Sequence, residues 1–89
     1  MLESDEIKHL RKMAHSIKPT VYIGKGGLTP AIIDEARAQL KRNHLIKIKL
    51  QRAALEEMDV DEAAKLLVSR VPRSTLIEKK GFCITLYCP

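Results

Sequence analysis

The sequence predicts a two-layer α+β domain with elements in the order α-β-α-β-α-β-β. Residues 45–50 read LIKIKL and alternate apolar side chains with lysines, which is typical of a strand with one covered face. Segments with apolar residues three and four apart lie on both sides of this strand, as in amphipathic helices. Helices that link parallel strands by right-handed crossovers lie on the same side of a sheet. We therefore expect a two-layer sandwich, with helices on one face of the sheet and an open second face.

The length of 89 residues is that of one domain, expected to cover residues 1–89. A hydrophobic fraction of 45% is ordinary for a folded protein. No apolar run approaches the roughly 18 residues of a membrane span, and the N-terminus does not resemble a secretory signal, so we expect a cytoplasmic protein. Cys83 and Cys88 are expected to remain reduced.

A first helix is expected over residues 4–17, with Ser4 as its N-cap, and Pro19 ends it. Residues 20–23 then form a short strand. The apolar stripe of the helix consists of Ile7, Leu10, Ala14 and Ile17.

A second helix begins with Thr29 as its cap and Pro30 at its first position, where no amide donor is needed, and stops near Asn43. After the strand at residues 45–50, Asp59 and Glu62 have the spacing of a capping box. This spacing predicts a third helix over residues 60–70. The remaining chain predicts a hairpin with strands at residues 74–78 and 82–88, joined through Lys79-Lys80-Gly81.

Between the first strand and the second helix lies the sequence VYIGKGGLTP, with three glycines in four residues. It lacks the spacing of a P-loop, and it has Thr29 where a dinucleotide fingerprint needs its third glycine. It does match the pattern G-x-x-G, as Gly24-Lys25-Gly26-Gly27. This pattern alone is also found in ordinary tight turns, where glycines permit a positive φ.

A loop of this kind can also hold phosphate. Glycines without a Cβ let the backbone approach a sugar-phosphate chain, and their amides can point at phosphate oxygens. Pro30 has no amide hydrogen, so Gly26, Gly27 and Leu28 are expected to supply most donors, and Lys25 adds a positive charge.

The net charge of +5, from 16 basic and 11 acidic residues, favours an anionic partner. Each basic side chain taken alone is a solvated surface charge. Together they predict an extended basic surface if the fold brings the loop and the first helix close to each other. Besides the loop, the candidate RNA-binding residues are Arg11, Lys12, His15, Lys18, Arg37, Lys41, Lys47 and Lys49.

Aromatic residues are few, which indicates recognition of backbone and shape more than stacking of successive bases. We expect Phe82 to be a core residue. Tyr22 is the one candidate for base stacking near the glycines.

The segment HLRKMAHSIKPTVYIGKGGLTPAIIDEARAQLKRNHLIKIKL resembles the YhbY-type, or CRM (chloroplast RNA splicing and ribosome maturation), RNA-binding domain. The closing GFCITLYCP is similar to the last strand of that family, whereas residues 51–73 carry little of its signal. The resemblance is carried by Leu10, Ala14-His15, Lys18-Pro19, the G-x-x-G-Leu-Thr run from Gly24 to Thr29, and LIKIK at residues 45–49.

This resemblance implies a fold like that of the C-terminal domain of bacterial translation initiation factor three, with a mixed four-stranded sheet and a KH-like G-x-x-G contact loop. Single-domain members are associated with precursors of the large ribosomal subunit, and multi-domain plant relatives with group II intron splicing. Gly24, Lys25, Gly26 and Gly27 inherit the RNA-contact role, and the basic residues near them extend it.

Two other function classes remain open. An enzyme is disfavoured because no nucleophile-base spacing or metal-ligand cluster is present, so we expect no catalytic residues, metal ligands or cofactor. A protein-interaction adaptor that docks on a ribosomal protein or an RNA-processing complex is the alternative to RNA binding. We expect a monomer that binds ribosomal RNA and no membrane, with a ribosomal protein as a possible further partner.

Overall fold

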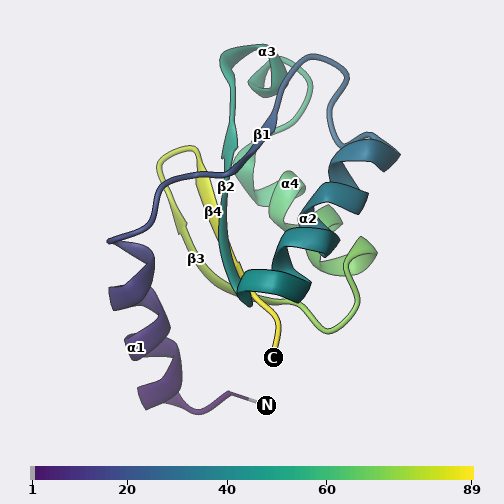
Figure 1. Cartoon of the computed structure of the whole chain (residues 1–89). Helices are drawn as coiled ribbons and strands as arrows, with labels where there is room; N and C mark the ends of the chain where they lie inside the picture. The colour runs from purple at the N-terminus through teal and green to yellow at the C-terminus, as the bar shows by residue number, and fades with distance from the viewer. Residues whose placement is uncertain (1) are drawn as a thin grey trace.

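The computed structural model describes residues 2–89 (Figure 1). The predicted order of helices and strands is confirmed, and one short helix, α3, is added to it. The elements are α1 (Ser4–Ala14), β1 (Val21–Ile23), α2 (Pro30–Asn43), β2 (Leu45–Leu50), α3 (Arg52–Leu55), α4 (Val60–Arg70), β3 (Thr75–Lys80) and β4 (Cys83–Tyr87).

The strands form one mixed sheet in the order β1-β2-β4-β3. β1 pairs with β2 in parallel, with Val21 opposite Ile48, and α2 is the connection between these two strands. β4 pairs antiparallel with both β2 and β3. The predicted mixed four-stranded sheet is therefore confirmed.

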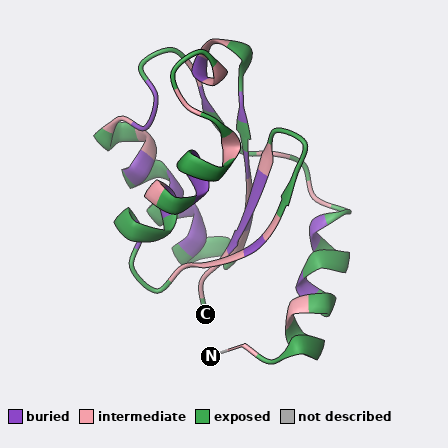
Figure 2. Ribbon diagram, turned by 180° about the vertical axis from the view of Figure 1, so that it is seen from behind, coloured by how far each residue is buried: buried purple, intermediate pink, exposed green. Residues whose placement is uncertain are grey.

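The main core lies between the sheet and the layer of α2 and α4 (Figure 2). In β2 the predicted alternation holds, because Ile46, Ile48 and Leu50 are buried in this core and Lys49 is exposed. The two helices contribute Ile33, Ala36, Leu40, Ala63, Ala64 and Leu67 to the same core.

The second face of the sheet is not as open as the sequence predicted. α1 lies on this side, across the sheet from α2 and α4, and contacts β2 and β3 (Figures 1 and 2). Leu10 and Ala14 are buried in this contact, and Nε of Arg11 donates a hydrogen bond to the carbonyl oxygen of Ile77 (3.1 Å). Because α1 precedes the first strand and links no two strands, the crossover rule does not determine its side. The second face is left open beside β1, where Tyr22 is exposed.

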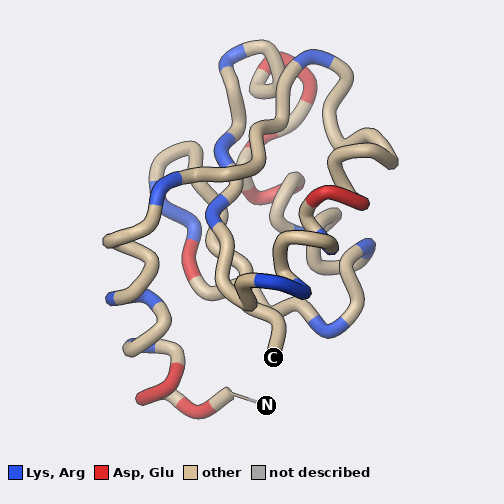
Figure 3. Tube along the Cα trace, viewed as in Figure 1, with Lys and Arg blue, Asp and Glu red and all other residues tan. Residues whose placement is uncertain are grey.

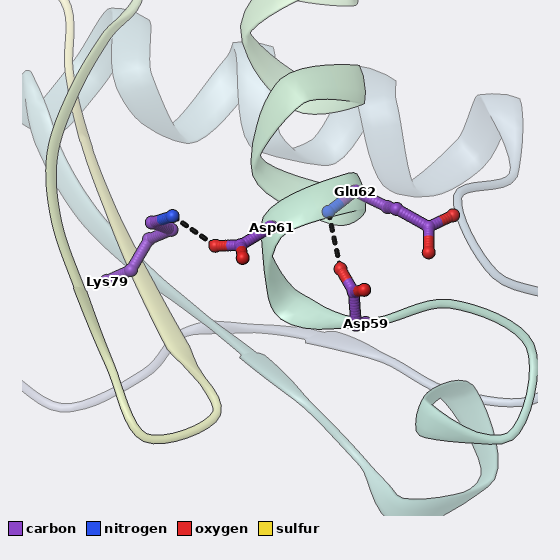
Figure 4. A network of polar contacts seen from close by, with 4 residues as sticks. All are labelled: Asp59, Asp61, Glu62 and Lys79. Carbon is purple, nitrogen blue, oxygen red and sulfur yellow. Dashed lines mark hydrogen bonds and ion pairs between the residues drawn. The ribbon is translucent and has the colours of Figure 1, made fainter.

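Both predicted caps of the connecting helices form. The hydroxyl of Thr29 accepts a hydrogen bond from the amide of Ile32 (3.3 Å), and Oδ1 of Asp59 accepts one from the amide of Glu62 (2.8 Å; Figure 4). Each satisfies a helix amide that would otherwise lack a partner. The cap predicted for α1 is wrong: Glu3 occupies the N-cap position and makes no side-chain hydrogen bond there.

The C-terminal hairpin differs from the prediction in its turn. Lys79 and Lys80 belong to β3, so the turn is formed by Gly81 and Phe82. The side chain of Phe82 is 54% exposed, and the prediction that it is a core residue is wrong. β3 also carries an irregularity between Leu76 and Glu78. Both cysteines are free.

Candidate nucleic-acid interface

The G-x-x-G loop is a closed turn at one end of the sheet. The amide of Gly27 donates a hydrogen bond to the carbonyl oxygen of Gly24 (3.1 Å), and Gly26, at the third position, has a φ of 99°. A positive φ at this position is the mark of a type II turn, which favours glycine there. Lys25 occupies the second position and is exposed, so its charge lies at the tip of the turn.

Fewer backbone donors are available than the sequence predicted. The amide of Gly27 is used to close the turn, so it is not free to bind an anion in this conformation. Within residues 2–89, the amides of Gly26 and Leu28 donate no hydrogen bond. Of these two residues, Leu28 is buried and Gly26 is exposed. The loop therefore offers the amide of Gly26 and the charge of Lys25 to a ligand.

The loop rests on the segment that follows β2, which the sequence did not connect with it (Figure 1). The amide of Gln51 donates to the carbonyl oxygen of Ile23 (2.8 Å). A Cβ on Gly27 would lie 3.1 Å from Cε of Met58. From α4, Nη1 of Arg70 donates to the carbonyl oxygen of Leu28 (3.4 Å). The two hydrogen bonds thus attach the residues that flank the turn to the segment after β2 and to α4, and Met58 lies close to Gly27.

Three lysines predicted to contact RNA lie close to the open part of the second face: Lys47 and Lys49 on β2, and Lys18 in the segment between α1 and β1. Figure 3 shows basic residues along both segments. Lys49 pairs with Tyr22 across β1 and β2, and the carbonyl oxygen of Lys47 accepts a hydrogen bond from the amide of Thr20 (3.0 Å). Lys18 and Lys47 both line a shallow groove of about 450 Å³ whose lining is largely apolar. We call Lys18, Lys47 and Lys49 the cationic strip.

Tyr22 lies beside this strip and is 49% exposed. Its hydroxyl donates a hydrogen bond to the carbonyl oxygen of Pro19 (3.3 Å). This contact restricts the ring while leaving part of it accessible. Tyr22 is also the residue before the last one of β1, so it lies close to the start of the turn.

The candidates on and near α1 separate into two groups. Arg11 is hydrogen-bonded to β3, and Nε2 of His15 lies 3.3 Å from Oε2 of Glu78, also on β3. Both side chains fasten α1 to the sheet. Lys12 is exposed, and its side chain makes no ion pair or hydrogen bond within residues 2–89.

Arg37 and Lys41 do not lie near the turn. They lie about 10 and 16 Å along α2 from Pro30, at the rise of an ideal helix. Both line a separate hollow at the other end of the helix, together with His44 and Arg73. The distance along the helix could have been read from the sequence, whereas the contribution of Arg73 could not.

The part of the chain that the structure describes has neither a metal-ligand cluster nor a helix that could span a membrane. Among residues 2–89, no three His, Cys, Asp or Glu side chains are grouped so that they could hold a metal ion. None of the described helices is both long and apolar enough to cross a membrane.

The sequence of residues 2–87 matches the family model of the CRS1 / YhbY (CRM) domain. The chain belongs to this family. The resemblance drawn from the loop, the Lys18-Pro19 pair and LIKIK is thereby confirmed.

Relatives of the CRM chain occur in archaea and bacteria. The probable RNA-binding protein MJ0652 of Methanocaldococcus jannaschii is 38% identical over 80 residues, which are 90% of this chain and 58% of that protein. The chain thus spans less than two thirds of this archaeal relative. The probable RNA-binding protein YqeI of Bacillus subtilis is 32% identical over 87 residues, which are 98% of this chain and 88% of that protein.

A solved structure supports the fold. The solution structure of SAV1595 from Staphylococcus aureus, a hypothetical protein described as a candidate RNA-binding protein, superposes with a TM-score of 0.80. The match covers 100% of this chain and 90% of that one, at 32% sequence identity.

Proposed function

We propose that this CRM domain is a non-catalytic RNA-binding protein that holds the phosphate backbone through the turn Gly24–Gly27. The observation that carries the proposal is the position of Lys25, an exposed cation at the tip of a closed glycine turn. The names of the relatives MJ0652 and YqeI support RNA as the ligand. The net charge of +5 is consistent with an anionic partner.

The chemistry of the turn suits a phosphate group. Gly26 is exposed and has no Cβ, so a phosphate oxygen can approach its unpaired amide. Lys25 adds a positive charge that attracts an anion. The hydrogen bond of Gly27 already fixes the turn, so the loop loses little conformational freedom on binding. A backbone amide and a lysine charge bind any phosphate alike, so contacts of this kind position the RNA and do not read its sequence.

The cationic strip extends this contact along the open face. An RNA strand leaving the turn over β1 and β2 passes Tyr22 and the lysines at positions 47 and 49. Tyr22 can stack with an unpaired base, which is worth about 1–3 kcal/mol in single-strand binding proteins. We therefore propose a strand with at least one unpaired base as the preferred ligand.

The resemblance extends the proposal to ribosomal RNA during assembly of the large subunit, in the cytoplasm. Crosslinking in cells followed by sequencing of the attached RNA tests this part. Enrichment of large-subunit precursor RNA is the expected result, and enrichment of unrelated RNA would remove the ribosomal assignment while leaving RNA binding in place.

The salt dependence of binding tests RNA contact itself. Fluorescence anisotropy of a labelled single-stranded RNA should show log affinity falling with log salt, with a slope of about −0.7 for each neutralised phosphate. A protein-interaction adaptor predicts no binding of this probe, or an affinity that barely changes with salt. Either of these results would contradict the proposal.

A further inference from the structure

A hollow of about 650 Å³ lies at the end of α2 that is remote from the turn. Its walls come from α2, from the segment after α4 and from the end of the chain beyond β4. Three cationic side chains line it: Arg37 and Lys41 from α2, and Arg73 from the segment after α4. Figure 3 shows basic residues at the last turn of α2 and in the loop below it.

The charges of this hollow are poorly neutralised. Asp34 is the only acidic side chain in its lining. The ion pairs within residues 2–89 are His15–Glu78 and Lys79–Asp61, so none of the three cations takes part in one. The lining also contains the buried apolar residues Leu40 and Val71, whereas the three cations are exposed.

The backbone around the hollow is held in an unusual conformation. His44 (φ 67°) and Arg73 (φ 69°) are the non-glycine residues with positive φ in residues 2–89, and both line the hollow. The amide of Cys88 donates to the carbonyl oxygen of His44 (2.8 Å), and Nδ1 of His44 lies 3.0 Å from the carbonyl oxygen of Cys88. His44 is the C-cap of α2, where a positive φ is common, whereas Arg73 caps no helix and is a backbone outlier of the kind found at functional sites.

The helix dipole does not account for this group of cations. A basic residue in the last turn of a helix is stabilised by the negative end of the dipole, which explains Lys41. Arg37 lies a turn earlier, and Arg73 belongs to another segment. The convergence of all three on one hollow calls for an anionic ligand.

We propose that the hollow binds a phosphate group. If the domain binds RNA as proposed above, the hollow holds a phosphate of the RNA backbone, roughly 16 Å along α2 from the turn. This assignment to RNA rests on the proposed function. The domain would then contact RNA at both ends of this helix. Free phosphate compounds share the same chemistry, and the experiments below separate the two sources.

The first experiment uses inorganic phosphate, followed by ¹H–¹⁵N NMR at constant ionic strength. The amides of His44 and Arg73 should shift saturably in the wild type. The double variant Arg37→Gln/Lys41→Gln should lose this response. The matched control Arg42→Gln/Lys65→Gln, which removes two exposed cations outside the hollow, should keep it. No saturable shift in the wild type, or the same shift in the Arg37→Gln/Lys41→Gln variant, would overturn the proposal.

The second experiment measures RNA affinity against salt for the same variants. Removing Arg37 and Lys41 should reduce the log-log slope by about 0.7, because the hollow holds one phosphate and each phosphate contact contributes roughly this amount. The control pair should leave the slope unchanged. An unchanged slope in the Arg37→Gln/Lys41→Gln variant would overturn the RNA assignment and assign the hollow to a free phosphate compound. The variant Lys25→Asp/Gly26→Asp should weaken RNA binding at least about tenfold and leave the NMR response to phosphate unchanged. Unchanged RNA affinity in this variant would therefore contradict the proposed function without affecting phosphate binding by the hollow.

Discussion

The amide nitrogen of Gly27 lies 3.1 Å from the carbonyl oxygen of Gly24 and donates a hydrogen bond to it. This bond closes the G-x-x-G segment into a turn and removes one of the amides that the sequence had offered to phosphate. Lys25 and the exposed Gly26 are left at the tip. The turn is thus both a tight structural turn and a candidate phosphate contact.

The conformation of Gly27 predicts that a side chain at this position destabilises the fold. Its φ is 68°, and an added Cβ would lie 3.1 Å from Cε of Met58. Gly81→Ala is the matched control, because its φ of 59° is also positive but nothing lies within 4 Å of an added Cβ. Urea unfolding should show a loss of about 1 kcal/mol for Gly81→Ala from backbone strain, and a larger loss for Gly27→Ala. Equal losses would show that the Met58 contact relaxes without cost.

Tyr22 is predicted to contribute to RNA binding through its ring. Tyr22→Ala should weaken binding of a single-stranded RNA at least about fivefold, the equivalent of 1 kcal/mol of lost stacking. Tyr22→Phe keeps the ring and loses only the hydrogen bond to Pro19, so it should bind like the wild type. Anisotropy titrations of the wild type, Tyr22→Ala and Tyr22→Phe with the same RNA measure these affinities. Wild-type affinity in the alanine variant would exclude a stacking role.

The contact between Lys79 and Asp61 predicts a pH-dependent contribution to stability (Figure 4). The hydrogen bond and the charge of Lys79 lower the pKa of Asp61 below its ordinary value of 3.8. A lowered pKa stabilises the folded state above pH 3.8, and this contribution is lost as the pH falls through the folded-state pKa. The wild type should therefore exceed Asp61→Asn in free energy of unfolding at pH 7, with the difference shrinking in acid.

Because Asp61 is exposed, this difference should be small and should decrease with added salt. Lys79→Gln supplies the control: in that background, Asp61→Asn should lose most of its pH dependence. Urea unfolding between pH 7 and pH 2 provides the measurement. A difference that stays constant over this range would show that the lowered pKa has no thermodynamic effect.

The parts of the fold that the sequence predicted depend on local patterns. The alternation of LIKIKL fixes which face of β2 is buried, and Thr29-Pro30 marks the start of α2 through cap chemistry. The parts that were missed depend on contacts distant in sequence. The side of the sheet taken by α1 follows from the packing of Leu10 and Ala14, and α3 is too short to show a helical period.

The sequence likewise predicted some parts of the candidate site and missed others. The turn and the cationic strip follow from the glycine pattern and from strand alternation. Arg37 and Lys41 were grouped with the turn because helical spacing shows which residues share a face, but not which neighbours that face meets. The positive φ of Arg73 has no signal in its residue type, and the distant contact of His44 with Cys88 is seen only in the fold.

The most direct test of phosphate binding by the turn compares two double variants. Lys25→Asp/Gly26→Asp adds two carboxylates, whereas Lys25→Asn/Gly26→Asn has the same shape without charge. Both place a side chain at the φ of 99°, which Asp and Asn tolerate better than most residues, so their unfolding curves should agree. Anisotropy with single-stranded RNA should show at least about a tenfold loss of affinity for the Asp pair and a smaller loss for the Asn pair. Wild-type affinity in a folded Asp pair would contradict the role of the turn.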